Sequence, residues 1–146
     1  MPFLLDTNVL SEPGRANPDA KVMAWLRSLD PLEVHISVLT LGEIGKGVTL
    51  MPPGPRKTAL REWLGHDLPE RFRGRVLPVD PEVAAAWGEL DAQGQRMGRA
   101  LPAVDGLLLA TAKVHDLTFA TRNMRDCGDR GVAVLNPWTG DPTVPG

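Results

Sequence analysis

The stretch FLLDTNVLSE, residues 3–12, decides the fold. Its apolar start, Phe3–Leu5, ends abruptly in Asp6 and further polar residues, a pattern typical of a buried strand that stops. In an open α/β sheet, ligands bind outside the carboxyl ends of the strands, so we expect Asp6 to lie at the mouth of an active site. The alternative is that Asp6 only caps a short helix beginning near Thr7.

Four further apolar runs are predicted to be strands, and amphipathic helical patterns lie between the elements. These runs are residues 34–36, 76–79, 117–120 and 132–135. Because strands alternate with helices along the chain, the sequence predicts an α/β fold with a central parallel sheet. Residues 1–140 are expected to form one domain, and residues 141–146 a loose tail.

Composition narrows the classes of protein that the chain can belong to. A length of 146 residues is enough for a core without disulfides or a structural metal, and the single cysteine, Cys127, excludes an intramolecular disulfide. No apolar run is long enough for a membrane span, and no secretory signal is recognisable. We therefore expect a cytoplasmic protein with no membrane partner.

Charge gives a mixed indication about nucleic acid. The net charge of −2 gives no global basic field, but the basic residues are clustered and most are arginine, whose fork suits phosphate. One cluster lies in a connection, residues 94–99, that is expected to be mobile. A site that concentrates carboxylates also lowers the net charge, so the balance does not argue against RNA.

A helix expected over residues 37–51 carries the second candidate acid, Glu43, at the edge of its apolar stripe. A carboxylate there costs free energy unless it is paired or metal-bound, and the simple partner is Lys46 at the i+3 position. The glycines of this helix each weaken it by about 1 kcal/mol relative to alanine. These glycines, Gly42, Gly45 and Gly47, suggest that another backbone approaches the helix closely.

The third candidate acid, Asp105, lies in the first turn of a helix that begins at Pro102. Asp105 either projects into the same mouth as Asp6 or only interacts favourably with the helix dipole. The strand over 117–120 also ends in polar residues, among them Thr121, Asn123 and Asp126. Asp126 could equally form a surface pair with Arg122 or Arg130.

Three motifs resemble those of the PIN-domain ribonucleases, specifically the VapC family of bacterial toxins and its FitB-like branch. They are FLLDTNVLSE at the start, Pro102-Ala103-Val104-Asp105, and Asn136-Pro137-Trp138 near the end. The resemblance implies a three-layer α/β/α sandwich whose clustered acids hold Mg²⁺ or Mn²⁺. By position, Glu43 corresponds to the acid of the second motif.

The resemblance also implies the residues of the site. Asp6, Glu43 and Asp105 would be catalytic and would bind the metal. Many members place an aspartate at the fourth position, where this sequence has Asn123, whose carbonyl oxygen could still face a metal or its water. Asp126 could supply the missing charge through water.

The chemistry of these residues agrees with a divalent cation. Three uncompensated carboxylates repel one another, and all-oxygen ligation favours Mg²⁺ or Mn²⁺ over zinc. Such an ion lowers the pKa of water and stabilises charge on a phosphodiester, so we expect endonucleolytic cleavage, with RNA as the substrate by resemblance. Side chains expected to orient the acids or water are Thr7, Asn8, Ser11 and Thr121.

Two other functions are compatible with the same acids. One is a receiver-like phosphoacceptor domain, and the other is a PIN-like module that binds RNA or protein without catalysis. The resemblance implies a homodimer and a small, DNA-binding, VapB-like antitoxin that blocks the acidic site. Trp63 and Leu64 could supply an apolar contact for this partner or could belong to the core.

Overall fold

The structure is a computed structural model that describes residues 2–143. Its centre is a six-stranded sheet in the order β3-β2-β1-β4-β5-β6. All neighbouring pairs are parallel except β5 and β6. The strands are β1 (Phe3–Leu5), β2 (Val34–Ser37), β3 (Val76–Leu77), β4 (Thr118–Ala120), β5 (Val134–Asn136) and β6 (Asp141–Thr143).

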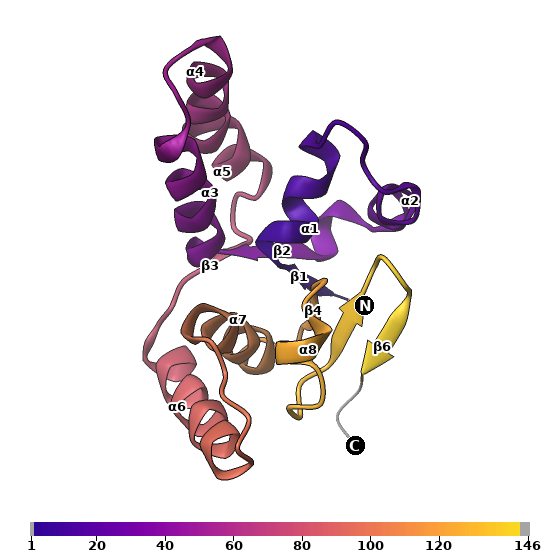
Figure 1. Ribbon diagram of the computed structural model, residues 1–146, viewed down its shortest axis with the longest axis vertical. Coiled ribbons are helices and arrows are strands. Elements are labelled where there is room, and N and C mark those ends of the chain that lie inside the picture. The colour runs from indigo at the N-terminus through magenta and orange to yellow at the C-terminus, as the bar shows by residue number, and fades with distance from the viewer. Residues whose placement is uncertain (1, 144–146) are drawn as a thin grey trace.

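Helices cover both faces of this sheet (Figure 1). None of those in the described part of the chain is long and apolar enough to cross a membrane. They are α1 (Thr7–Ser11), α2 (Ala20–Ser28), α3 (Val38–Leu50), α4 (Pro55–Glu62), α5 (Leu68–Arg71), α6 (Pro81–Arg96), α7 (Ala103–Val114) and α8 (Met124–Cys127), with short 3-10 turns at Glu12–Gly14 and Pro31–Glu33.

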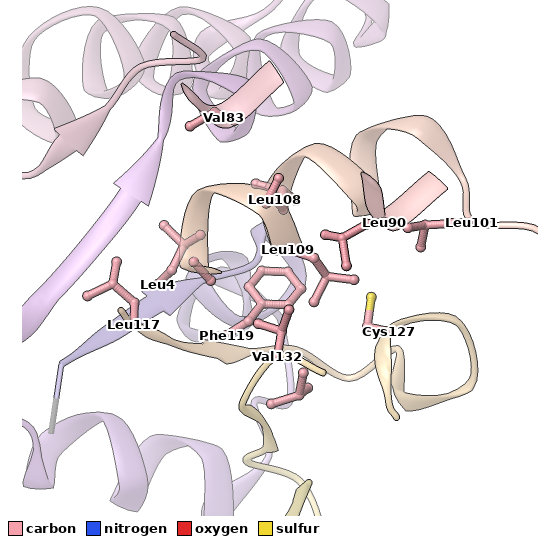
Figure 2. Packing of buried hydrophobic residues seen from close by; sticks show 13 residues of the cluster. Leu4, Val83, Leu90, Leu101, Leu108, Leu109, Leu117, Phe119, Cys127 and Val132 are labelled. Carbon is pink, nitrogen blue, oxygen red and sulfur yellow. The ribbon is translucent and has the colours of Figure 1, made fainter. Parts of the chain in front are cut away.

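Alternation along β1 divides the core into two layers. Leu4 points into a cluster with α6 and α7, where Leu109 and Phe119 are fully buried (Figure 2). Phe3 and Leu5 point to the opposite face, where α1, α2 and α5 pack, and Phe3 meets Trp25 edge to face at 5.0 Å. Because successive strand residues point to opposite faces, one apolar strand holds both helical layers. The predicted α/β/α sandwich is confirmed.

The helical segment that begins with α4 is not regular throughout. A π-helical turn, Trp63–Asp67, separates α4 from α5. Pro69 lies in the first turn of α5 and has no N–H to donate to the preceding turn, so the regular helix cannot continue through it. Trp63 and Leu64 are partly buried against the second core cluster, which assigns them to the core and not to an open surface.

The last parallel strand starts later than expected, at Val134 and not at residue 132. Asp129 and Gly131 both have positive φ angles, 58° and 77°, so the backbone is still turning at that point. The ladder then begins where Val134 pairs with Phe119. Val132 is nevertheless buried, which explains why its apolar side chain suggested strand.

The prediction of a loose tail from residue 141 is wrong for Asp141–Thr143. These residues form β6, which pairs antiparallel with β5 through the register Val134 with Thr143 and Asn136 with Asp141. A turn at 137–140, with Gly140 at φ 78°, reverses the chain. Residues 144–146 lie outside the described residues.

Close backbone approach occurs at different glycines from those predicted. A Cβ at Gly42 or Gly47 would meet nothing within 4 Å, and one at Gly45 would make only ordinary contact with Leu64, at 3.5 Å. By contrast, a Cβ at Gly106 on α7 would lie 2.9 Å from Cδ1 of Trp87 on α6. Gly106 therefore sets how closely α6 packs against the helix that carries Asp105.

We expect Gly106→Ala to destabilise the protein by about 1–3 kcal/mol, because the added methyl group overpacks the contact with Trp87. Gly88→Ala on α6 is the matched control, since a Cβ there meets nothing within 4 Å. The control should gain up to about 1 kcal/mol from helix propensity. Urea unfolding of both variants measures the difference, and equal stabilities would contradict this packing.

Candidate active site

Asp6 lies at the junction between β1 and α1 and is only 6% exposed. Its Oδ1 accepts a hydrogen bond from the backbone N–H of Thr7 at 2.7 Å, so it does cap α1. Its Oδ2 accepts from the hydroxyl of Thr121 at 2.7 Å and from the amide of Asn8 at 3.3 Å. The two interpretations of Asp6 are thus compatible, because one oxygen caps the helix while the other joins a polar network.

Thr7 links this network to α3. Its hydroxyl donates to Oε1 of Glu43 at 2.6 Å, which holds the exposed Glu43 carboxylate against the start of α1. Lys46 forms no ion pair with Glu43 within the described residues. The partner of Glu43 is therefore a hydroxyl, and its negative charge stays uncompensated.

Asn123 joins the other two acids. Its amide nitrogen donates to Oδ2 of Asp105 at 3.2 Å and to Oδ2 of Asp126 at 3.1 Å. Its carbonyl oxygen, which was expected to face a metal or its water, accepts from the backbone N–H of Asp126 at 3.3 Å and caps α8. In this arrangement the side chain of Asn123 is a donor that bridges two carboxylates.

Two of the remaining predicted contacts are not formed. Among described residues Asp126 makes no ion pair with Arg122 or Arg130, although Nε of Arg130 donates to its backbone carbonyl. Ser11 is exposed at the end of α1 and its hydroxyl has no hydrogen bond in the described structure. Of the side chains expected to orient the acids, Thr7, Asn8 and Thr121 are brought to Asp6 or Glu43, and Ser11 is not.

The acids affect one another electrostatically. Burial raises the pKa of Asp6 to about 6, the hydrogen bonds from Thr121 and Thr7 partly oppose this rise, and the charges of Asp105 and Glu43 add to it. The pKa of Asp105 is raised by burial first and then by Asp126 and Glu43, while the hydrogen bond from Asn123 lowers it. No lysine, arginine or histidine of the described chain forms an ion pair with these acids.

The donor set fits a hard divalent cation. Its groups are carboxylate oxygens. Burial first, and then repulsion between the acids, raise the pKa values of Asp6 and Asp105, and a bound cation would offset both effects. As the side chains lie, however, no three His, Cys, Asp or Glu residues in the described structure are arranged to hold one ion. The chemistry of the site therefore fits Mg²⁺ or Mn²⁺, although the carboxylates are not gathered around one point.

Arg99 and Arg130 connect the backbone segments next to the acids, a role that the sequence did not indicate. The guanidinium of Arg130 is buried and donates to the carbonyl oxygens of Arg99 and Ala100 as well as to that of Asp126. Arg99 in turn donates to the carbonyl oxygens of Gly128 and Arg125. This arginine clamp ties the segment before α7, which bears Asp105, to α8, which bears Asp126.

Residues 94–99, which were expected to form a mobile connection, are partly helical, since α6 extends to Arg96, and Arg99 is held by hydrogen bonds. A Cβ at Gly94 would lie 2.7 Å from the carbonyl oxygen of Arg99 and 3.0 Å from Nη1 of Arg130, so the turn closes tightly there. The signal in the sequence was the pair of arginines flanking two acidic motifs. It could not be interpreted, because arginine in a loop usually contacts solvent.

We expect Arg130→Met to destabilise the protein by about 3 kcal/mol, because backbone carbonyl groups that its guanidinium satisfies lose their charged donor. Arg130→Lys should restore little, since an ammonium group lacks the planar fork. Arg125→Met is the control, because Arg125 is exposed and only its carbonyl takes part in the clamp. Urea unfolding compares the three variants, and a stable Arg130→Met protein would contradict the clamp.

The raised pKa of Asp6 predicts how stability depends on pH in the absence of metal. The folded protein keeps the Asp6 proton up to about pH 6, whereas the unfolded chain releases it near 3.8. Stability should therefore fall as the pH rises from about 4 to about 6, by at most about 3 kcal/mol. Urea titrations in chelator should show this loss in wild type and in the control Asp67→Asn, at an exposed position. A profile of Asp6→Asn with the same slope would assign the loss to other groups.

Comparison with known proteins supplies independent information. A family model described as PIN domain matches residues 3–125. The chain is 43% identical to the toxin FitB of Neisseria gonorrhoeae, over 93% of this chain and 98% of that protein. It is 34% identical to the VapC ribonuclease Y4jK of Sinorhizobium fredii, over 93% and 97% of the two chains.

A solved structure is similar over nearly the same length. The structure titled as FitAB bound to an IR36 DNA fragment contains a chain that superposes with a TM-score of 0.89 at 41% identity. The match covers 93% of this chain and 95% of that one. Fold and sequence similarity thus extend together over almost the whole chain, including the three segments that carry Asp6, Glu43 and Asp105.

Proposed function

From the premise that the chain belongs to the PIN-domain family, we propose that it is the toxin of a toxin–antitoxin pair and a metal-dependent endoribonuclease. The observation that supports the activity is the charge repulsion that Glu43 exerts on both Asp6 and Asp105, which no cation of the described chain compensates through an ion pair. Of the relatives, FitB is a toxin and Y4jK is a VapC ribonuclease.

Asp6, Glu43 and Asp105 would hold the cation, with Asp126 contributing charge from beyond them. A bound Mg²⁺ or Mn²⁺ would stabilise negative charge on the phosphodiester and make water more acidic. The chain's own groups prepare the acids for this task. Thr121 fixes one oxygen of Asp6, and Thr7 fixes Glu43 against α1.

Asn123 has a different role from the fourth acid of many relatives. Its amide nitrogen holds Asp105 and Asp126 near each other without adding negative charge. Two carboxylates that share one donor repel less than two bare ones, so the site tolerates their proximity before a cation arrives. We therefore propose that Asn123 positions the acids and that its oxygen is not a ligand.

The partners follow from the same family. The similar solved structure is titled as FitAB bound to DNA, and by analogy we propose a small, DNA-binding antitoxin as the partner of this chain. We also propose that the chain forms a homodimer. A cytoplasmic location belongs to the same proposal, because the proposed substrate is RNA. The receiver-like alternative loses its support, since the matching family is the PIN domain. The catalytically silent module is the alternative that an experiment must separate.

The purified protein, free of any partner, is expected to cleave RNA with Mg²⁺ or Mn²⁺ and to stop when a chelator is added. Asp6→Asn and Asp105→Asn should each lower the cleavage rate by at least about 100-fold, because each removes a carboxylate that would hold the cation. The protein should stay folded, since each substitution also removes one of several like charges. Asp67→Asn, an exposed control, should cleave as wild type does.

Two measurements run beside the assay of cleaved RNA. Circular dichroism checks folding, and calorimetric titration with Mn²⁺ checks metal binding. Cleavage that persists in chelator would exclude the metal, and unfolded variants would make the acids structural. A folded wild type that binds Mn²⁺ yet cleaves none of a varied set of RNAs would favour the silent module.

A further inference from the structure

The order of the strands places two exposed cations on opposite sides of the acids. Along the carboxyl edge of the sheet the strands follow as β2, β1, β4 and β5. Asp6 follows β1, α3 with Lys46 follows β2, and Arg122 follows β4. Lys46 therefore lies on the β2 side of Asp6, and Arg122 lies on its β4 side.

Arg122 is a cation that is kept away from the acids. Its backbone lies within the site, because Thr121 bonds Asp6 and Asn123 bonds Asp105. Its guanidinium instead lies over the ring of Trp138, 5.0 Å from the centroid. The backbone N–H of Arg122 donates to Oδ1 of Asn8 at 3.4 Å, but its guanidinium forms no hydrogen bond or ion pair within the described residues. Its N–H donors are therefore free, and stacking on Trp138 holds them in place.

Lys46 lies at the edge of a hollow beside Glu43. The hollow has a volume of about 470 Å³ and is open to solvent. Val38 on α3 and Val104 on α7 are its exposed apolar walls, at 40% and 39% exposure. The ammonium group of Lys46 has no ion pair in the described part of the chain, although Glu43 is only one helical turn away. The residues that line it are Val38, Leu39, Gly42, Glu43, Lys46 and Val104.

We propose that single-stranded RNA crosses the acidic centre along this edge, with a phosphate held by Arg122 on one side and another by Lys46 on the other. The base nearest Lys46 lies against Val38 and Val104. This inference rests on the proposed function and adds the path of the substrate across the site and the two side chains that hold it. The chemistry agrees, because arginine forks and ammonium groups bind phosphate, and an apolar wall is reached only by an unstacked base.

The path also explains why a site this acidic can accept a polyanion. The acids would repel phosphate on their own, so attraction has to come from groups beside them. Arg122 and Lys46 supply one positive charge on each side, and neither charge is already neutralised by an acid of the described chain. Stacking on Trp138 prevents Arg122 from collapsing onto the carboxylates.

Binding of a labelled 12-nucleotide single-stranded RNA of mixed sequence, measured by fluorescence anisotropy in chelator so that no cleavage intervenes, tests the path. Lys46→Met and Arg122→Gln should each weaken binding by about 10-fold. Each should also lower the slope of log affinity against log salt by about 0.7, the value for one phosphate contact on a single strand. Arg122→Lys should recover only part of the affinity, since it keeps the charge and loses the fork.

Matched controls remove one exposed cation elsewhere. Lys113→Met near the end of α7 and Arg96→Gln at the end of α6 should change binding by less than twofold. Val38→Ser should weaken binding of the RNA but not of an abasic strand of the same length. A duplex of the same sequence should bind wild type more weakly than the single strand does.

The outcomes separate this path from the proposed function. If wild type cleaves RNA and the Lys46 and Arg122 variants bind and cleave as it does, the path is wrong and the function stands. If wild type does not cleave but these variants bind RNA more weakly than the controls, the path stands and the proposed catalysis fails. Equal weakening in Lys113→Met and Arg96→Gln would overturn the path, because it would reduce the effect to net charge.

Discussion

The burial of the Asp6 carboxylate is the constraint on which the rest of the structure depends. A carboxylate that is 6% exposed must be hydrogen-bonded, and the donors that satisfy it come from the next residue and from the end of the neighbouring strand β4. These donors fix where β1 stops, where α1 begins and how β4 ends. One side chain thereby sets the arrangement of three elements.

The charge of Asp6 is only partly satisfied by those bonds. Its pKa stays above the ordinary value because burial and the nearby acids outweigh the hydrogen bonds from Thr121 and Thr7. The same imbalance exists at Asp105. The scaffold keeps the acids near one another against this repulsion through hydrogen bonds from Thr7, Thr121 and Asn123 and through the arginine clamp behind them. Neutral donors therefore bind the carboxylates of the candidate site, and the two arginines of the clamp bind the carbonyl groups of the backbone next to it.

The arginines near the site have two different roles, and the difference decides where positive charge is available. Arg99 and Arg130 use their forks on carbonyl groups, which need donors more than they need charge. Arg122 lies over an aromatic ring and leaves its donors free. Positive charge thus reaches the neighbourhood of the acids without neutralising them, which leaves both the acids and Arg122 available to other molecules.

The sequence by itself determined the α/β fold and the positions of most strands, and it supplied three acids as candidates for the site. These features depend on local patterns, namely apolar runs that stop at Asp6 and Thr121 and a helix start before Asp105, and they need no knowledge of distant contacts. Strand β6 was missed because residues 141–143 contain no apolar run, and their pairing with β5 is a contact that appears only in the folded chain.

Only the tertiary structure decided what each polar group of the site does. The sequence offered Lys46 as the partner of Glu43 and the oxygen of Asn123 as a metal ligand, whereas folding pairs Glu43 with Thr7 and turns the amide nitrogen of Asn123 toward two acids. Folding also brings Arg130 to carbonyl groups that lie 30 and 31 residues earlier in the chain. The physical reason is that hydrogen-bond partners are chosen by distances of about 3 Å, and distances between remote segments exist only after the core has packed.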